Sequence, residues 1–386
     1  MSWLYRSVVR PALFTQDPED IHERTLHMLG WVSRCQLRCD WLGSFLRAPS
    51  LPVDLFGLKF PNPIGLAAGM DKDATALPAW AALGFGFCEL GTVTRQAQPG
   101  NPRPRIFRLV AEDALINRMG FNNPGAEAMA ETMAAWRAQG LWPDHPVGIS
   151  LGKSRSTPLA QAPEDYANSL RVLWPHGDFF VVNVSSPNTP DLRKLQDKAA
   201  LDAVLAAVQE ANRVNSRESR DESRGAKNLK PEIRNPKLPK PILVKVAPDL
   251  SLDALDEILE LFGPRQIAGI VATNTTGARP QTDDPRLQRI YAEAGGLSGK
   301  PLRARSTEVI RHIHRQTRGQ VPVIGVGGIF SAQDAWDKIT AGAALVEIYT
   351  GLVYEGPGVV KNIVAGLIKR LETAGVDHLR EVIGSA

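Results

Sequence analysis

The stretch "FVVNVSS" (Phe180–Ser186) decides the fold, because it is apolar without alternation and then ends in an amide and two hydroxyls. Continuous hydrophobicity over so short a run is typical of a strand buried on both faces of a parallel sheet. Seven more runs of this kind occur along the chain, at 63–70, 87–94, 147–152, 242–248, 269–275, 321–328 and 345–351. Helix-like stretches separate them. Eight such units predict an α/β fold of the (β/α)8 barrel type.

A doubly wound open sheet is the competing architecture. It would need a G-x-G-x-x-G turn after its first strand to bind a dinucleotide, and the run at 63–70 has no such turn. The barrel is therefore the preferred fold.

Composition places the chain among soluble globular proteins. Of its 386 residues, 43% are hydrophobic and 22% charged, which allows one large α/β domain with a small appendage. No stretch approaches the roughly 20 apolar residues of a membrane span, and no signal peptide is recognisable. The three cysteines lack zinc-ligand spacing, so we expect packing residues in a reducing compartment and no metal site.

The net charge of +4 and the pI near 9 raise the question of a nucleic-acid partner. Much of the excess lies in Asn212–Pro241, which mixes both signs and has few large apolar residues. We interpret this segment as a solvated insertion at about 212–240. No nucleic acid is expected to bind. The predicted division is an N-terminal helical segment, 1–50, and a barrel domain, 51–386.

The N-terminal segment predicts two short helices. The first, over 2–14, carries Trp3 and Leu4 on an apolar face, and the second begins with Asp17 as N-cap. Such helices suit either a membrane surface or an ordinary hairpin packed on the barrel. The pattern alone does not choose between these two.

Polar residues gather where the predicted strands end. The carboxyl ends of barrel strands meet at one rim, where active sites lie. The residues there are Lys72, Thr92, Ser150, Asn183, Ser186, Asn188, Lys245, Thr273, Asn274, Thr275, Gly327, Gly328, Tyr349 and Thr350. Lys245 interrupts an apolar run, and burying its charge is expensive without an anionic partner. We therefore expect a bound, electron-rich ligand to supply that negative charge.

Glycine-rich stretches indicate a phosphate site at the same rim. "GVGGI" (325–329) and "IYTG" (348–351) follow the last two strands, and "GGLSGKPL" (295–302) offers another glycine-rich loop. Barrels often bind phosphate through backbone N–H groups after strands seven and eight. The predicted ligand is a phosphate-bearing molecule that lies across the barrel mouth.

Nine motifs in order resemble the membrane-associated, class 2 dihydroorotate dehydrogenases. They are "AAGMDKD" (67–73), "GTVT" (91–94), "INRMGFNN" (116–123), "NVSSPNTP" (183–190), "KVAPDL" (245–250), "ATNTT" (272–276) and the three glycine-rich stretches. The resemblance implies oxidation of dihydroorotate to orotate in de novo pyrimidine biosynthesis, with one FMN per chain and a membrane quinone as electron acceptor. It implies that the N-terminal helices form a membrane-facing lid, and we expect a monomer.

The resemblance also implies roles for single residues. Ser186 would be the catalytic base, and His22 and Arg108 would line the quinone tunnel. Substrate contacts would fall on Lys72, Asn117, Arg118, Met119, Gly120, Phe121, Asn183, Asn188, Asn274 and Thr275. FMN contacts would fall on Ala68, Gly69, Met70, Asp71, Lys72, Thr92, Ser150, Asn183, Lys245, Thr273, Gly299, Gly328, Tyr349 and Thr350.

Ser150 and Ser154 depart from the family pattern, which usually has Asn at both positions. A serine is shorter and has a single donor, so the usual FMN contact at Ser150 is expected to be lost, water-mediated or replaced. In the implied mechanism, Lys72 polarises a substrate carbonyl, Ser186 relays the proton, and Lys245 stabilises the reduced, anionic flavin.

Other activities fit parts of the sequence. An FMN-dependent tRNA dihydrouridine synthase would explain the basic insertion, but such enzymes use Cys as the base, as do soluble class 1 relatives. A non-catalytic binding barrel has no use for Lys72, Lys245 and Ser186 together. No presequence is recognisable before Trp3, which favours a bacterial enzyme, peripheral to the cytoplasmic side of the inner membrane.

Overall fold

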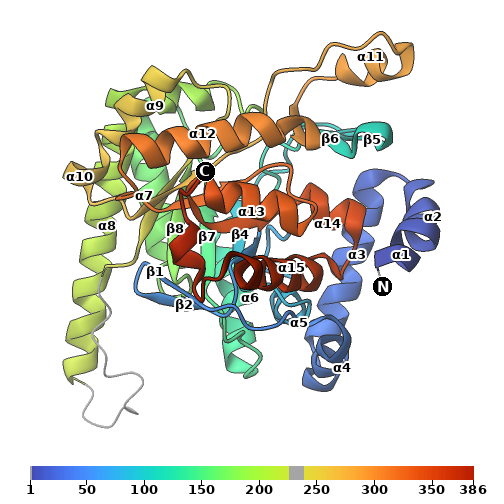
Figure 1. Ribbon diagram of the computed structural model, residues 1–386. Coiled ribbons are helices and arrows are strands. Elements are labelled where there is room, and N and C mark those ends of the chain that lie inside the picture. Colours follow the sequence, from blue (N-terminus) through green and yellow to red (C-terminus); the bar gives the residue numbers. More distant parts are fainter. Residues whose placement is uncertain (1, 226–238) are drawn as a thin grey trace.

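Eight parallel strands close into a barrel in the computed structural model, which describes residues 2–225 and 239–386 (Figure 1). The strands are β3 (Ile64–Leu66), β4 (Phe87–Val93), β7 (Val147–Leu151), β8 (Phe179–Asn183), β9 (Ile242–Val246), β10 (Gly269–Ala272), β12 (Val323–Val326) and β13 (Ala343–Ile348). They pair in chain order, and β13 closes on β3. Each overlaps one predicted apolar run. The barrel is confirmed, and the open sheet is wrong.

Helices cover the outside of the barrel. They are α5 (Leu77–Ala82), α6 (Ala126–Ala138), α7 (Ala162–Leu173), α8 (Lys198–Gly225), α9 (Leu252–Leu259), α10 (Phe262–Arg265), α12 (Arg303–Gln316), α13 (Ala332–Thr340), α14 (Thr350–Glu355) and α15 (Val359–Ala374). Side chains of successive strand residues alternate between these helices and the barrel interior. Both faces of each barrel strand are therefore apolar, which explains the unbroken hydrophobic runs.

Apolar side chains fill the barrel interior toward the amino ends of the strands. Phe87, Phe179, Val181, Leu243, Val271, Ile324 and Leu345 form one buried cluster there. The hairpin of β1 (Val53–Leu55) and β2 (Leu58–Phe60) closes the amino end, where Phe60 meets Phe87 edge to face at 5.4 Å. Any ligand site must therefore lie at the opposite, carboxyl end of the strands.

A small antiparallel sheet lies over that carboxyl end. It consists of β5 (Ile106–Leu109), β6 (Ala114–Asn117) and β11 (Gly296–Gly299), and α11 (Pro285–Tyr291) projects beyond it on an arm (Figure 1). The interpretation of 295–302 as a loop is thus wrong in part. Strands of four residues carry too little pattern to be distinguished from loops by sequence.

The N-terminal helices are confirmed. They are α1 (Ser2–Leu4), a π-helical turn over Tyr5–Val9, α2 (Arg10–Phe14), α3 (Pro18–Ser33) and α4 (Gln36–Leu46). Asp17 caps α3, since its Oδ1 accepts from the backbone N–H groups of Glu19 at 2.9 Å and Asp20 at 3.1 Å. Figure 1 shows these helices gathered along one side of the barrel.

The first part of the predicted insertion at about 212–240 is helical. Residues 212–225 continue helix α8, and the rest, 226–238, lies outside the described residues. Asn212 is buried and accepts at Oδ1 from Trp174 Nε1 at 2.8 Å and from the Lys240 N–H at 3.0 Å. These hydrogen bonds compensate the burial of the Asn212 amide, whereas Arg213, Val214, Arg217 and Glu218 further along the helix are exposed.

Candidate active site

A central cavity lies between the carboxyl ends of the strands and the β5–β6–β11 sheet. Most residues predicted for the site line it. They are Ala68, Gly69, Lys72, Thr92, Asn117, Met119, Gly120, Phe121, Asn183, Ser186, Asn188, Lys245, Thr273, Asn274, Thr275, Gly299, Gly328, Tyr349 and Thr350. They come from seven of the eight barrel strands or their loops, as well as from the small sheet, so the chain converges on one place.

Four predicted contacts lie outside the cavity lining: Met70, Asp71, Arg118 and Ser150. Asp71 accepts from the Thr75 and Ala76 N–H groups at 2.8 and 2.9 Å and from Trp80 Nε1 at 2.9 Å. Its carboxylate therefore shapes the loop behind the cavity. Arg118 turns outward to Glu293, 2.5 Å from its carboxylate.

Ser150 lies behind the cavity wall. Its hydroxyl is 3.1 Å from that of Thr92, which in turn accepts from Asn183 Nδ2 at 2.9 Å. Thr92 and Asn183 line the cavity. The Ser150 hydroxyl is thus hydrogen-bonded to one lining residue and, through it, linked to another. Ser154 is buried and donates to Asp165 at 3.1 Å.

Four asparagine side chains are connected by hydrogen bonds at the cavity wall. Asn274 Nδ2 donates to Ser185 Oγ at 3.0 Å, and Ser185 Oγ donates to Asn183 Oδ1 at 2.9 Å. On the side of the small sheet, Asn188 Nδ2 donates to Asn117 Oδ1 at 3.1 Å. All four asparagines line the cavity. They suit a flat ligand that carries both hydrogen-bond donors and acceptors.

Ser186 lies in the cavity wall with 5% of its surface exposed. Its Oγ accepts from the Asn188 N–H at 3.2 Å. Within the described ranges, no hydrogen bond connects this hydroxyl to a histidine or a carboxylate. The geometry is that of a positioned hydroxyl, not of a catalytic dyad.

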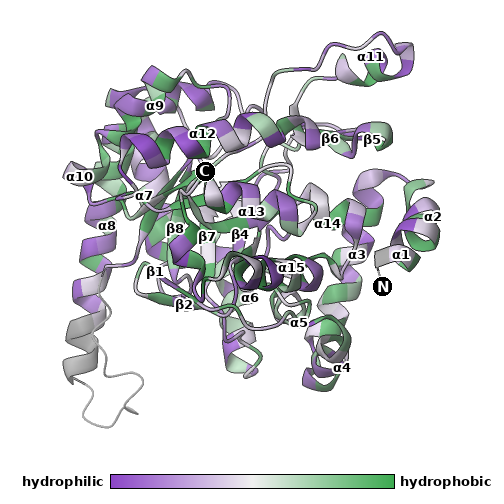
Figure 2. Cartoon of the chain, in the orientation of Figure 1, coloured by the Kyte–Doolittle hydropathy of each residue, from purple (hydrophilic) through white to green (hydrophobic). Residues whose placement is uncertain are grey.

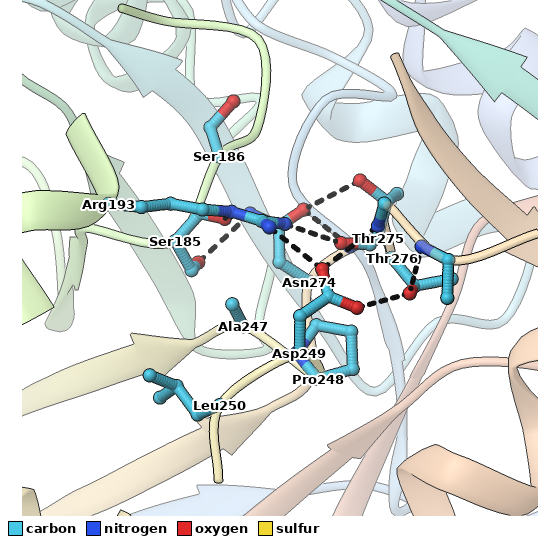
Figure 3. Close-up of polar contacts among 12 residues, drawn as sticks. Ser185, Ser186, Arg193, Ala247, Pro248, Asp249, Leu250, Asn274, Thr275 and Thr276 are labelled. Carbon is cyan, nitrogen blue, oxygen red and sulfur yellow. Dashed lines mark hydrogen bonds and ion pairs between the residues drawn. The ribbon is translucent and has the colours of Figure 1, made fainter. Parts of the chain in front are cut away.

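An arginine that the sequence did not point to anchors the Ser186 loop (Figure 3). Arg193 Nε donates to the Ser185 carbonyl at 3.1 Å, Nη1 to Asp249 at 2.7 Å, and Nη2 to the Thr275 carbonyl at 3.2 Å. One guanidinium thus joins the loops after β8, β9 and β10. In Figure 3 the Ser186 side chain points away from this network.

Lys72 brings a positive charge to the cavity. Burial lowers the pKa of its ammonium to about 8, although Asp73 acts in the opposite direction. Among the described residues, no carboxylate lies within 4 Å of Lys72 Nζ. An anionic ligand would therefore complete this site, since a buried cation is stabilised by a counter-charge.

His22 of α3 lies near Lys72. Burial, and then the charge of Lys72, lower the pKa of the imidazole to about 3. The ring is therefore neutral at physiological pH.

Lys245 has anionic partners that the sequence interpretation missed. Its Nζ lies 3.1 and 3.2 Å from the two Glu89 oxygens and 3.6 Å from Glu347 Oε2. The expectation that a ligand must supply the negative charge is therefore wrong. The signal was present, because "FCELG" (87–91) and "LVEIYTG" (345–351) each bury a carboxylate in an apolar strand as "ILVKVAP" (242–248) buries the lysine.

Glycines at the end of β11 and directly after β12 line another part of the cavity. Gly299, Gly327 and Gly328 have φ of 97°, 121° and 72°, in the left-handed region that favours glycine. A Cβ on Gly328 would lie 2.5 Å from Arg303 Cβ. Beside them, the Ser298 and Thr350 hydroxyls are 2.9 Å apart. The backbone is therefore bare in this part of the cavity, next to these two hydroxyls.

Polar contacts bind the N-terminal helices to this side of the barrel. Tyr5 Oη donates to the Val353 carbonyl at 2.8 Å, and Arg10 Nη1 to the Tyr354 carbonyl at 3.1 Å. Arg108 of β5 donates to the Gln16 carbonyl at 2.7 Å and lies over the Phe14 ring, 4.5 Å from its centroid. The helices thus pack on the barrel, as one of the two sequence readings expected.

The same helices carry most of the exposed apolar surface. Nine of the eleven exposed large hydrophobic side chains in the described part of the chain belong to the first 50 residues: Trp3, Leu4, Val8, Val9, Met28, Trp31, Leu37, Trp41 and Phe45. Figure 2 shows hydrophobic colour on α1, α2 and α4 at the edge of the molecule. A concentration of this size marks an interaction surface. No helix among the described residues is long and apolar enough to cross a bilayer.

Comparisons with known proteins agree on one family. The family model described as dihydroorotate dehydrogenase matches residues 50–371. A dihydroorotate dehydrogenase (quinone) from Gloeobacter violaceus is 52% identical over 99% of both chains, and one from Nostoc punctiforme is 48% identical over 99% of this chain and 98% of its own. The crystal structure of DHODH from Eimeria tenella in complex with ferulenol aligns with a TM-score of 0.81 at 33% identity, covering 96% of this chain and 95% of its own.

Proposed function

This chain belongs to the dihydroorotate dehydrogenase family, and from that premise we propose a role for each group of residues in its cavity. The reaction is the oxidation of dihydroorotate to orotate with a quinone as electron acceptor, a step of pyrimidine biosynthesis. The observation that carries the proposal is the convergence of Lys72, Ser186 and Lys245 on one cavity. The alternative of a tRNA dihydrouridine synthase is set aside, because the relatives matched over the full length carry the first activity.

We propose that the flavin is FMN, one per chain. Its phosphate would lie at the bare backbone of Gly299, Gly327 and Gly328, beside the Thr350 hydroxyl. Lys245 in the barrel floor and Thr92 and Asn183 in the wall would hold the ring system. When bound, the cofactor accepts two electrons from the substrate and passes them on to the quinone.

The substrate would lie between Lys72 and the amides of Asn117, Asn183, Asn188 and Asn274. Lys72 would neutralise the substrate carboxylate or polarise the adjacent carbonyl, which makes the neighbouring C–H more acidic. The amides would orient the flat ring by pairing with its imide groups. Tight orientation of this kind is a large part of the rate enhancement in such sites.

Ser186 would accept the proton released from the substrate carbon. A neutral hydroxyl is a weak base, so the substrate must be acidified by Lys72 before the proton moves. The N–H of Asn188 fixes the Ser186 oxygen, and the Arg193 network fixes the loop that carries it. Ser186 therefore contributes mainly a fixed oxygen position, and its basicity is the smaller contribution.

Electrons would leave on the side of the N-terminal helices. We propose that a quinone enters between α2, α3 and β5, passing Arg108 and His22 before it reaches the flavin. A neutral His22 and the Phe14 ring provide a weakly polar route for such a molecule. The exposed apolar side chains of the first 50 residues would dock the protein on the membrane that holds the quinone.

The setting we propose is a monomer, peripheral to the cytoplasmic face of a bacterial inner membrane. The test is the cofactor released from the purified protein, separated and identified by mass. One FMN per chain is expected. FAD, or a colourless protein that takes up no FMN, would overturn the assignment of the cavity.

A further inference from the structure

Three charged side chains lie together at the floor of the cavity, which Lys245 and Glu347 line while Glu89 pairs with Lys245. Glu89 of β4, Lys245 of β9 and Glu347 of β13 are 0%, 4% and 0% exposed. Two residues earlier on the same strands stand Phe87, Leu243 and Leu345 of the packed barrel interior. Residues two apart in a strand share a face, so the three charges point into the barrel directly above an apolar layer.

The charges in this cluster do not balance if all three groups are ionised. Lys245 Nζ is close to both Glu89 oxygens, at 3.1 and 3.2 Å, and farther from Glu347 Oε2, at 3.6 Å. One ammonium would then face two carboxylates, leaving a net negative charge in a dry interior. Two carboxylates that share one site do not both ionise readily.

Glu347 is the less well satisfied of the two acids. Neither of its carboxyl oxygens has a hydrogen-bond donor among the described residues, and both are buried. A protonated Glu347 would itself donate a hydrogen bond to Glu89, an interaction that raises its pKa. Protonation would thus supply the partner that the ionised form lacks.

Among the described residues, no basic side chain other than Lys245 lies within 4 Å of the Glu347 carboxylate. Its neighbours on β12 and β3 are Val326 and Gly65. Burial, and then Glu89, raise the pKa of Glu347 well above the usual range, although Lys245 opposes them. The Cys88 thiol also lies within electrostatic reach, and burial raises its pKa so that it stays neutral.

We propose that Glu347 carries a proton in the resting protein, so that the Glu89–Lys245–Glu347 cluster is electrically neutral. Glu347 then acts as a positioning residue that sets the charge beneath the cofactor. This inference rests on the flavin site proposed above. An ionised Glu347 would oppose the arrival of electrons at that site, whereas the neutral acid does not.

Infrared spectroscopy of the purified holoprotein, labelled with ¹³C-glutamate, tests the proton directly. The wild type is expected to show the C=O stretch of a neutral glutamic acid that is missing in Glu347→Gln. The same band should also be lost in Glu89→Gln, because Glu347 then becomes the sole counter-ion of Lys245 and ionises. A wild type without the band, or a band that persists in Glu89→Gln, overturns the proposal.

The flavin reduction potential provides a second readout on the same proteins. Both single variants keep the cluster neutral, so the ratio of reduced to oxidised flavin at a fixed potential should change less than tenfold, about 30 mV for two electrons. If Glu347 were ionised, Glu347→Gln would remove a negative charge and raise the potential beyond this limit. Flavin content is measured first. Protein that binds no flavin refutes the proposed site, while the infrared band still decides the state of Glu347.

Discussion

Arg105 and Glu19 form a buried, two-pronged ion pair that ties α3 to the segment leading into β5. The Arg105 Nη2 to Glu19 Oε1 distance is 2.7 Å, and Nε lies 3.0 and 3.1 Å from the two carboxylate oxygens. Glu19 is 3% exposed and Arg105 8%. Removing one partner of such a pair typically costs about 3–5 kcal/mol, because the other charge is left buried. The pair therefore holds the N-terminal helices against the barrel.

Glu19→Gln should consequently slow the oxidation of the flavin by quinone without slowing its reduction by dihydroorotate. With the helices loosened, reoxidation of the flavin by a long-chain quinone should slow about tenfold or more, while reduction by dihydroorotate stays near the wild-type rate. Stopped-flow absorbance measures both steps. Glu23→Gln, exposed on the same helix and paired with Arg103, is the matched control. Equal slowing of both steps would show that the pair supports the barrel instead of the quinone route.

Replacement of Ser186 by Ala should leave FMN bound and slow its reduction by dihydroorotate about 100-fold or more. A positioned proton acceptor usually contributes that much. Ser186→Cys should retain more activity than Ala, because the thiol can still take a proton. Ser156→Ala, on an exposed loop, controls for the loss of a hydroxyl. A Ser186→Ala protein that is reduced as fast as the wild type in a single turnover would remove the serine from the mechanism.

The two lysines should differ in what they support. Lys245→Gln leaves Glu89 and Glu347 without a cation, so it should lower the flavin potential or release FMN. Lys72→Gln should instead weaken dihydroorotate binding and turnover while FMN stays bound, since no carboxylate in the described part of the chain lies within 4 Å of Lys72 Nζ to pair with it directly. Flavin content and redox titration distinguish the two. Identical profiles for the two variants would contradict this division.

The buried His22 should make the folding stability of the protein depend on pH in the acidic range. Its pKa is about 3 in the fold, against an ordinary value of 6.5. Below pH 6.5 the unfolded chain binds the proton and the folded one does not, so folding stability falls by up to about 1.4 kcal/mol per pH unit until about pH 3. The thermal midpoint of His22→Asn minus that of the wild type should therefore be larger at pH 5 than at pH 7.5. His27→Asn, on the exposed side of the same helix, should show no such gain.

Sequence reasoning succeeded where one physical signal dominated. Strands buried on both faces produce unbroken apolar runs, so all eight barrel strands were predictable, and Asp17 before Pro18 located the start of α3. It failed where partners are distant along the chain. Arg193 and Asp249 are 56 residues apart, and nothing local shows that they meet. Likewise, the strand-end position of Ser150 does not reveal that its hydroxyl meets that of Thr92.

The central claim is that one cavity holds FMN and dihydroorotate together, with Ser186 beside the substrate carbon that loses its proton. Anaerobic mixing of the purified protein with dihydroorotate, followed at the flavin absorbance band, tests it most directly. The account predicts that the band bleaches within one turnover, with one orotate formed per flavin, and that a quinone then restores it. A bound flavin that dihydroorotate leaves oxidised would contradict the account.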